Sequence, residues 1–142
     1  MCTSDYKNLK VWRKSMDLAS VIYSFVKMLP GEERFALADQ MRRSVVSIPS
    51  NIAEGQSRGT PKEFAHFLRI AKGSTSELET QLLLCVKLGF VGQVDAQKGL
   101  ELCTEVGKML RSLMLTCLQN DKSQSSTNPQ PGFNDYPLTT NN

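Results

Sequence analysis

The residues of this chain that could carry out chemistry are few, and their spacing matches no complete catalytic or metal-binding arrangement. Glu63 and His66 have the Glu-x-x-His spacing that di-iron helical bundles use for metal ligands. Such sites need this pair twice, and His66 is the single histidine of the chain. The serines and cysteines have no histidine partner in a triad-like set, and no Gly-rich loop follows a strand. We expect no metal, no cofactor and no enzymatic activity.

The four cysteines are typical of a reduced protein interior. None forms a Cys-x-x-Cys pair, which argues against zinc, and Cys103 and Cys117 fall on an apolar helical stripe. The first five residues carry no signal-peptide pattern, and no run of about 18 apolar residues predicts a membrane helix. We therefore expect a cytoplasmic protein with buried free thiols. The cysteines are Cys2, Cys85, Cys103 and Cys117.

Basic residues form two rows at helical spacing, although the net charge is only +3. Such rows can contact nucleic-acid phosphates, and the absence of interleaved aromatic residues argues against base stacking. The alternative is an ordinary solvated face, which Asp17 and Glu63 partly neutralise. The candidate nucleic-acid-binding residues are Lys7, Lys10, Arg13 and Lys14 in the first row, and Arg58, Lys62, Arg69 and Lys72 in the second, where His66 also falls.

Polar residues of two helices recur at steps of three and four and predict a polar seam. We interpret the seam as a network that fixes helix register or subunit contact, in which Arg42 or Arg43 would pair with Glu77 or Glu79. A surface groove and a catalytic carboxylate pair, formed by Glu54 and Glu77, are the alternatives. The seam residues are Arg42, Arg43, Ser47, Asn51, Glu54, Ser74, Glu77 and Gln81.

Apolar periodicity predicts four long helices, at about residues 8–28, 32–58, 61–88 and 94–118. The first has so wide an apolar arc that one neighbouring helix would not cover it. The second contains Pro49, which predicts a bend. Thr60, Pro61 and Glu63 are a strong start signal for the third, Gly89 is its stop, and Asn120 ends the fourth.

Short connections between long helices predict an all-α, antiparallel, up-down-up-down four-helix bundle. We expect a polar lead-in at residues 1–6, the bundle at residues 7–120, and a tail at residues 121–142. The tail is rich in Ser, Thr, Asn, Gln and Pro, and this composition is typical of disorder. In helix three, the small residues Gly73 and Ser74 would let another backbone come close.

Two motifs carry a resemblance to a known family. The stretch from Arg42 to Gly55 reads RRSVVSIPSNIAEG, and the stretch from Phe67 to Ser74 reads FLRIAKGS and is followed by ELETQL. Both are similar to the proteins encoded in intervening sequences of bacterial 23S ribosomal RNA genes, over about residues 6–118. The accessory variability determinant of diversity-generating retroelements resembles the same family.

This resemblance implies a homo-oligomeric ring, with a pentamer expected. It also implies association with RNA or with a nucleic-acid enzyme such as a reverse transcriptase, and it supplies no established activity. The sequence thus leads to a hypothesis of a non-enzymatic, ring-forming, nucleic-acid-associated accessory protein. The rival hypothesis is a structural or protein-binding homo-oligomer that has no affinity for nucleic acid.

Overall fold

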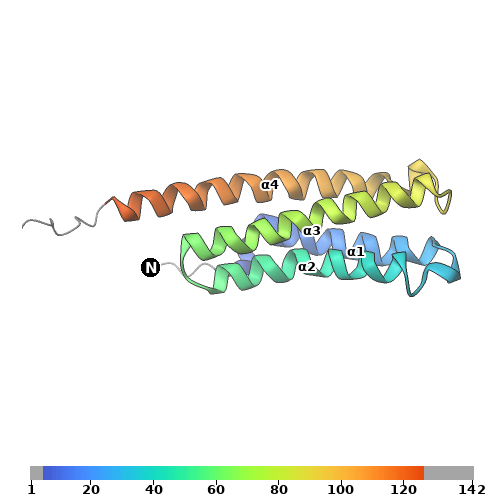
Figure 1. The fold of residues 1–142 in the computed structure, drawn as a ribbon, viewed down its shortest axis with the longest axis horizontal. Helices are drawn as coiled ribbons and strands as arrows, with labels where there is room; N and C mark the ends of the chain where they lie inside the picture. Colours follow the sequence, from blue (N-terminus) through green and yellow to red (C-terminus); the bar gives the residue numbers. More distant parts are fainter. Residues whose placement is uncertain (1–4, 127–142) are drawn as a thin grey trace, which may run out of the picture.

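Four long α-helices run side by side in alternating directions through the part of the chain that the computed structural model describes, residues 5–126 (Figure 1). The predicted all-α four-helix bundle is therefore confirmed. The helices are α1 (Lys10–Phe25), α2 (Leu37–Ser57), α3 (Pro61–Lys87) and α4 (Gln93–Ser125). Short 3₁₀ turns flank α1 and precede α2, at η1 (Tyr6–Asn8), η2 (Val26–Met28) and η3 (Gly31–Glu33).

The ends of α3 follow the sequence signals. The Thr60 Oγ1 atom accepts a hydrogen bond from the Glu63 backbone N–H at 3.2 Å and donates one to the Glu63 carboxylate at 2.8 Å. Pro61, which lacks an N–H, occupies the first helical position, where no intrahelical partner is available. After Lys87 the chain turns through Gly89, whose φ of +76° favours glycine.

The start of α2 lies later than the sequence predicts. Residues 31–33 form η3 in place of a first α-helical turn, and α2 begins at Leu37. The Glu33 carboxylate accepts a hydrogen bond from the Leu37 N–H at 3.4 Å. Glu33 thus lies before the helix and accepts a hydrogen bond from one of its free N–H groups. A negative charge at this end of a helix is stabilising.

The fourth helix continues to Ser125, so its expected end at Asn120 is wrong. Residues 121–125, expected in a disordered tail, are helical. Their side chains are mostly polar, and the last turns of α4 project past the connection between α2 and α3 (Figure 1). The predicted disorder of residues 127–142 and the position of Cys2 lie outside the described residues.

Helix α2 is continuous through Pro49, which is buried. Pro49 has no N–H to donate to the carbonyl of Val45. Side chains bond the two carbonyls that follow: Ser50 Oγ donates to the Val46 oxygen at 2.7 Å, and Asn51 Nδ2 donates to the Ser47 oxygen at 2.8 Å. The carbonyls of Val46 and Ser47 thus gain side-chain donors, next to the Val45 carbonyl that lacks its backbone donor.

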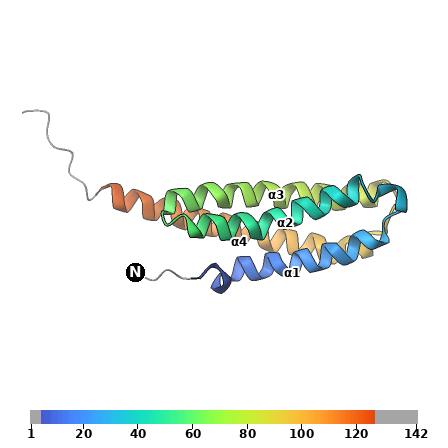
Figure 2. The ribbon, with the colours of Figure 1, turned by 90° about the horizontal axis from the view of Figure 1, so that it is seen from below.

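Helices α1 and α3 lie at opposite corners of the bundle, because each packs against both α2 and α4 (Figure 2). The wide apolar arc of α1 is thus covered from two sides. Its most deeply buried row is not the one that contains Met16, which is 45% exposed. The buried row consists of Val11, Ser15, Leu18, Ile22 and Phe25.

Close helix approach occurs at glycines other than the one that the sequence suggested. Gly73 is exposed, and a Cβ atom there would meet nothing within 4 Å. At Gly55, by contrast, a Cβ atom would lie 2.6 Å from the Cβ atom of Phe67. Gly55 therefore allows the end of α2 to pack directly on the start of α3.

Candidate nucleic-acid interface

The centre of the predicted polar seam exists as a hydrogen-bonded cluster between α2 and α3. The hydroxyl oxygens of Ser47 and Ser74 lie 2.8 Å apart, and Asn51 Nδ2 donates to Ser47 Oγ at 2.9 Å. All three side chains are partly buried. This cluster joins side chains of two helices, as a network between packed helices would. Its role in fixing the register of the helices stays a prediction.

The charged residues of the seam do not join this cluster, and the expected ion pairs with Glu77 or Glu79 are wrong. Arg43 instead pairs with Asp39 one turn earlier on α2, at 3.3 Å. Arg42 lies in a pocket at the connection between α1 and α2. An ion pair four residues apart on one helix needs no help from a neighbouring helix, which explains why Arg43 stays on α2.

The remaining seam residues also bond within their own helices. Glu54 pairs with Arg58 at 2.8 Å. Gln81 is buried and its Nε2 atom lies 3.4 Å from the exposed Glu77 carboxylate, while its Oε1 atom is buried without a hydrogen-bond partner in the described structure. The predicted seam is thus a short cluster of neutral side chains with separate charged groups above and below it.

Glu54 and Glu77 are too far apart to act as a catalytic pair. Ser47 and Ser74 are at the same level, and from there the two antiparallel helices carry Glu54 and Glu77 in opposite directions. At about 1.5 Å of rise per residue, the two glutamates are separated by roughly 15 Å along the bundle axis. Paired carboxylates that act on one bond lie at most about 9.5 Å apart in glycoside hydrolases, the best-defined case.

The two predicted basic rows belong to elements at opposite corners of the bundle, the first to η1 and α1 and the second to α3 (Figure 2). In the first row, Lys14 pairs with Glu105 of α4 at 3.3 Å, and Lys7 lies 3.9 Å from Asp5. Lys10 and Arg13 are exposed on α1. Each row thus has a residue beside α4, Lys14 in the first row and Lys72 in the second.

One residue of the second row, Lys72, lies in a groove between α3 and α4. Lys62 and Arg69 are exposed along α3, and Lys72 lines the groove. Arg58, beside the start of this row, pairs with Glu54 and lies over the Phe67 ring at 5.2 Å. The structure thus brings Lys72 to the groove and holds Arg58 in local contacts.

Two cations of α4 line the same groove, and sequence reasoning missed them. Lys108 and Arg111 face Lys72 across a groove of about 310 Å3, and the hydroxyl-bearing residues Ser76 and Thr104 lie on its walls. Among the described residues that line it, Glu79 is the one carboxylate. The spacing of Lys108 and Arg111 places them on one helix face, but only the register of α3 against α4 shows that this face adjoins Lys72.

The described cysteines are buried and free. Burial raises the pKa of Cys103 to about 12, and the negative charge of Glu79 adds to this effect. Burial, followed by the charge of Glu33, raises the pKa of Cys85 to about 11, and burial also raises the pKa of Cys117. These thiols stay protonated at neutral pH, which makes them poor nucleophiles.

Within residues 5–126, no group of three or more His, Cys, Asp or Glu side chains is placed to hold a metal ion. Glu63 caps α3 by bonding to Thr60, and the His66 ring packs edge-to-face against Phe67. Both side chains of the Glu-x-x-His spacing therefore have structural contacts. None of the helices in the described part of the chain has the length and apolar character needed to span a membrane.

Comparison with known proteins agrees with the motifs and with the fold. A search of curated proteins gives no match. The crystal structure of a protein of unknown function from the S23 ribosomal protein family of Bacteroides thetaiotaomicron is similar, with a TM-score of 0.68 and 28% sequence identity over 73% of this chain and 97% of that one. The family model of the 23S rRNA-intervening sequence proteins matches residues 7–112. This chain belongs to the family of 23S rRNA-intervening sequence proteins.

Proposed function

We propose that this chain is a non-enzymatic accessory protein that self-associates and binds the phosphate backbone of RNA. The observation that carries the proposal is the groove between α3 and α4, where Lys72, Lys108 and Arg111 converge with Glu79 as the one carboxylate among the described lining residues. Cations placed along a groove neutralise phosphates and release counterions, which gives affinity without reading sequence.

The shape of the groove also favours a backbone ligand over a small substrate. It is a shallow surface channel, and its described lining contains no aromatic side chain on which a base could stack. Lys62 and Arg69 continue the positive charge along the exposed face of α3. In an oligomer each subunit would present this surface, so that weak contacts would add through multivalency.

Exposed aliphatic residues support self-association, for which we propose a pentameric ring. Val46 on α2 and Ile70 on α3 are 45% and 41% exposed, and the surface at Gly73 is open. Light scattering on the purified protein should give a mass near five times the 15.8 kDa of one chain. A monomer at micromolar concentration would contradict the ring. The partnership with a reverse transcriptase, implied only by resemblance, stays a prediction.

A salt series with a pair of matched variants tests RNA binding. Fluorescence anisotropy with labelled single-stranded RNA, from about 50 to 200 mM salt, should show affinity that falls as salt rises. If three cations of each engaged subunit contact phosphates, log K should fall with log salt with a slope of about −2 per subunit. The double variant Lys72→Ala/Lys108→Ala should weaken binding by about tenfold or more and flatten the slope.

The control is Lys87→Ala/Lys98→Ala, which removes the same number of positive charges from the same two helices at exposed positions away from the groove. This control should change affinity much less than the groove variant. Equal losses in the two variants would mean that only net charge matters. Absence of salt-sensitive binding in the unmodified protein would favour the rival function, a protein-binding oligomer.

A further inference from the structure

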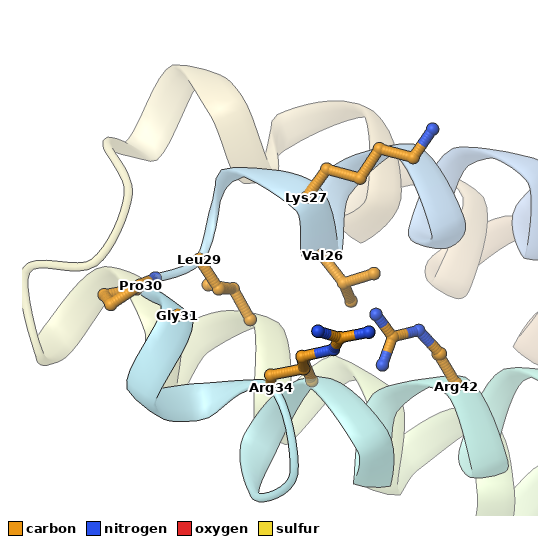
Figure 3. Close-up of a pocket in the computed structure, with 8 residues that line it drawn as sticks. Val26, Lys27, Leu29, Pro30, Gly31, Arg34 and Arg42 are labelled. Atoms are coloured by element: carbon orange, nitrogen blue, oxygen red, sulfur yellow. The ribbon is translucent and has the colours of Figure 1, made fainter.

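A second cationic site lies at the connection between α1 and α2, away from the groove just described. A pocket of about 180 Å3 is lined by apolar side chains on one side, including Val26 and Leu29, and by Lys27, Arg34 and Arg42. Figure 3 shows the guanidinium groups of Arg34 and Arg42 pointing toward each other beneath Val26, whereas the Lys27 amine points away. Two like charges that converge in this way repel each other unless an anion lies between them.

The protein supplies no anion for these two arginines within the described residues. None of its carboxylates there lines the pocket or lies within 4.0 Å of either guanidinium as an ion pair. Two acidic residues of this region have other partners: Glu33 accepts a hydrogen bond from the Leu37 N–H, and Asp39 pairs with Arg43. The Arg34 guanidinium also lies 5.4 Å from the centre of the Phe35 ring, which helps to hold it in place.

We propose that Arg34 and Arg42 form a binding site for a phosphate monoester. Guanidinium groups present several N–H donors in a fixed planar fork that matches phosphate oxygens. A phosphate monoester carries a charge of about −1.5 to −2 at pH 7, which balances two arginines, whereas a single carboxylate carries only one negative charge. The pocket has room for a multi-atom group, since one water needs only about 10–15 Å3 of such space.

The apolar wall suggests how the rest of the ligand would sit. Val26 and Leu29 line the pocket beside the arginines. Both side chains belong to the buried core, so only their outermost atoms would contact the sugar or base that carries the phosphate. The phosphate monoester has two sources, a free nucleotide or the 5′-phosphate end of an RNA strand. The site is formed by the α1–α2 connection and not by the α3–α4 groove, so it does not depend on the proposed function.

Calorimetric titration of the full-length protein with AMP, and with adenosine as the phosphate-free control, tests the site. AMP should bind with a dissociation constant at or below the millimolar range, and adenosine should bind much more weakly. The variants Arg34→Gln and Arg42→Gln should each weaken AMP binding by about tenfold or more, as expected for loss of a charged hydrogen-bonding partner. Arg42→Lys should bind AMP more weakly than the unmodified protein, because it keeps the charge and loses the fork.

Arg43→Gln is the matched control, because Arg43 is the next residue of the same helix, pairs with Asp39 and does not line the pocket. It should change AMP affinity less than about twofold, and thermal melting of every variant should show that the bundle is folded. A parallel titration compares a 5′-phosphorylated RNA strand with the same strand bearing a 5′-hydroxyl. An Arg42-dependent gain from the 5′-phosphate would assign the site to RNA ends, whereas Arg42-dependent binding of AMP alone would assign it to free nucleotides.

Two results would overturn the proposal. One is the absence of Arg42-dependent binding of both AMP and the 5′-phosphorylated strand at millimolar concentration. The other is an equal effect of Arg43→Gln and Arg42→Gln, which would reduce the interaction to net charge. The groove variant Lys72→Ala/Lys108→Ala should lose RNA binding and keep AMP binding, because the two sites are separate. The two proposals can therefore fail independently.

Discussion

The hydroxyl groups of Ser47 and Ser74 lie 2.8 Å apart and join α2 to α3 in the middle of the bundle. One of them donates and the other accepts, and Asn51 supplies a further N–H to Ser47 Oγ. Buried apolar residues of the same two helices, such as Ile48 and Leu78, make contacts that have no direction and therefore fit more than one register. A directional bond between two small side chains favours one register over the others.

A double-mutant cycle should detect this bond. Ser47→Ala and Ser74→Ala should each lower the free energy of unfolding by about 1 kcal/mol, because each leaves the other hydroxyl without its partner. The double variant should lose less than the sum of the two, as measured by urea denaturation. Ser50→Ala is the control, since Ser50 bonds only the Val46 carbonyl of its own helix, and its effect should add to that of Ser74→Ala. An additive result for Ser47 and Ser74 would contradict the register role.

Gly55→Ala should destabilise the bundle although alanine is the better helix former. The new Cβ atom would lie 2.6 Å from the Phe67 Cβ atom, which is fixed to the α3 backbone and cannot rotate away. Overpacking of this kind costs about 1–3 kcal/mol, measurable as a lower urea midpoint. Unchanged stability would show that α2 and α3 separate easily at this end.

Gly73→Ala is the matched substitution in α3 and should act in the opposite direction. Nothing lies within 4 Å of the position of its Cβ atom, so the protein should gain about 0.5–1 kcal/mol from helix propensity. Light scattering on the same variant examines self-association. A Gly73→Ala protein that is destabilised and dissociated would mean that a second chain packs on this glycine.

The buried thiols should make the protein less stable at alkaline pH. Their pKa values are raised in the folded state, to about 11 for Cys85 and about 12 for Cys103, so the folded protein keeps protons that the unfolded chain releases. Their contribution is complete below the unfolded pKa of about 8.5 and is lost as the pH rises toward the folded values. At pH 10 the loss should be on the order of 2 kcal/mol per thiol.

Urea denaturation at pH 7 and pH 10 measures this effect. Cys103→Ala should be less stable than the unmodified protein at pH 7 because it opens a cavity, yet its stability should fall less between the two pH values. The two proteins differ only at residue 103, so the difference in slope isolates the thiol. Identical slopes would mean that the Cys103 thiol ionises as readily in the folded protein as in the unfolded chain.

Gln81→Met should preserve or raise stability, in spite of its place in the predicted seam. Gln81 is 6% exposed, and its Oε1 atom is buried without a hydrogen-bond partner in the described structure. Methionine has a similar shape and removes that unpaired oxygen, whose burial costs about 1–3 kcal/mol. A thermal melt that shows a clear loss of stability would instead indicate that Gln81 has a hydrogen-bonding role.

Local signals in the sequence were sufficient for the helices and for several of their ends. Thr60, Pro61 and Glu63 predicted the start of α3, and Gly89 its end, because capping depends on residues within one turn. The apolar periods predicted four long helices and hence the bundle. The prediction was wrong where two local signals competed, as at Glu33, which caps α2 from outside rather than beginning it.

What only the tertiary structure decided is which side chains of different helices meet. A helical period shows that Lys108 and Arg111 share a face, but the packing of α4 on α3 places that face beside Lys72. Packing also places Phe67 against Gly55, so that Gly55 rather than Gly73 is the site of close helix approach. In the same way, the connection between α1 and α2 brings Arg34 to Arg42. The sequence by itself determined the helices and the contacts within them, because helical hydrogen bonds and caps are local. The register of one helix against another, and the corner of the bundle that each helix occupies, depend on packing energies summed over whole helix faces. These energies arise between residues far apart in the sequence, so no local pattern reveals them.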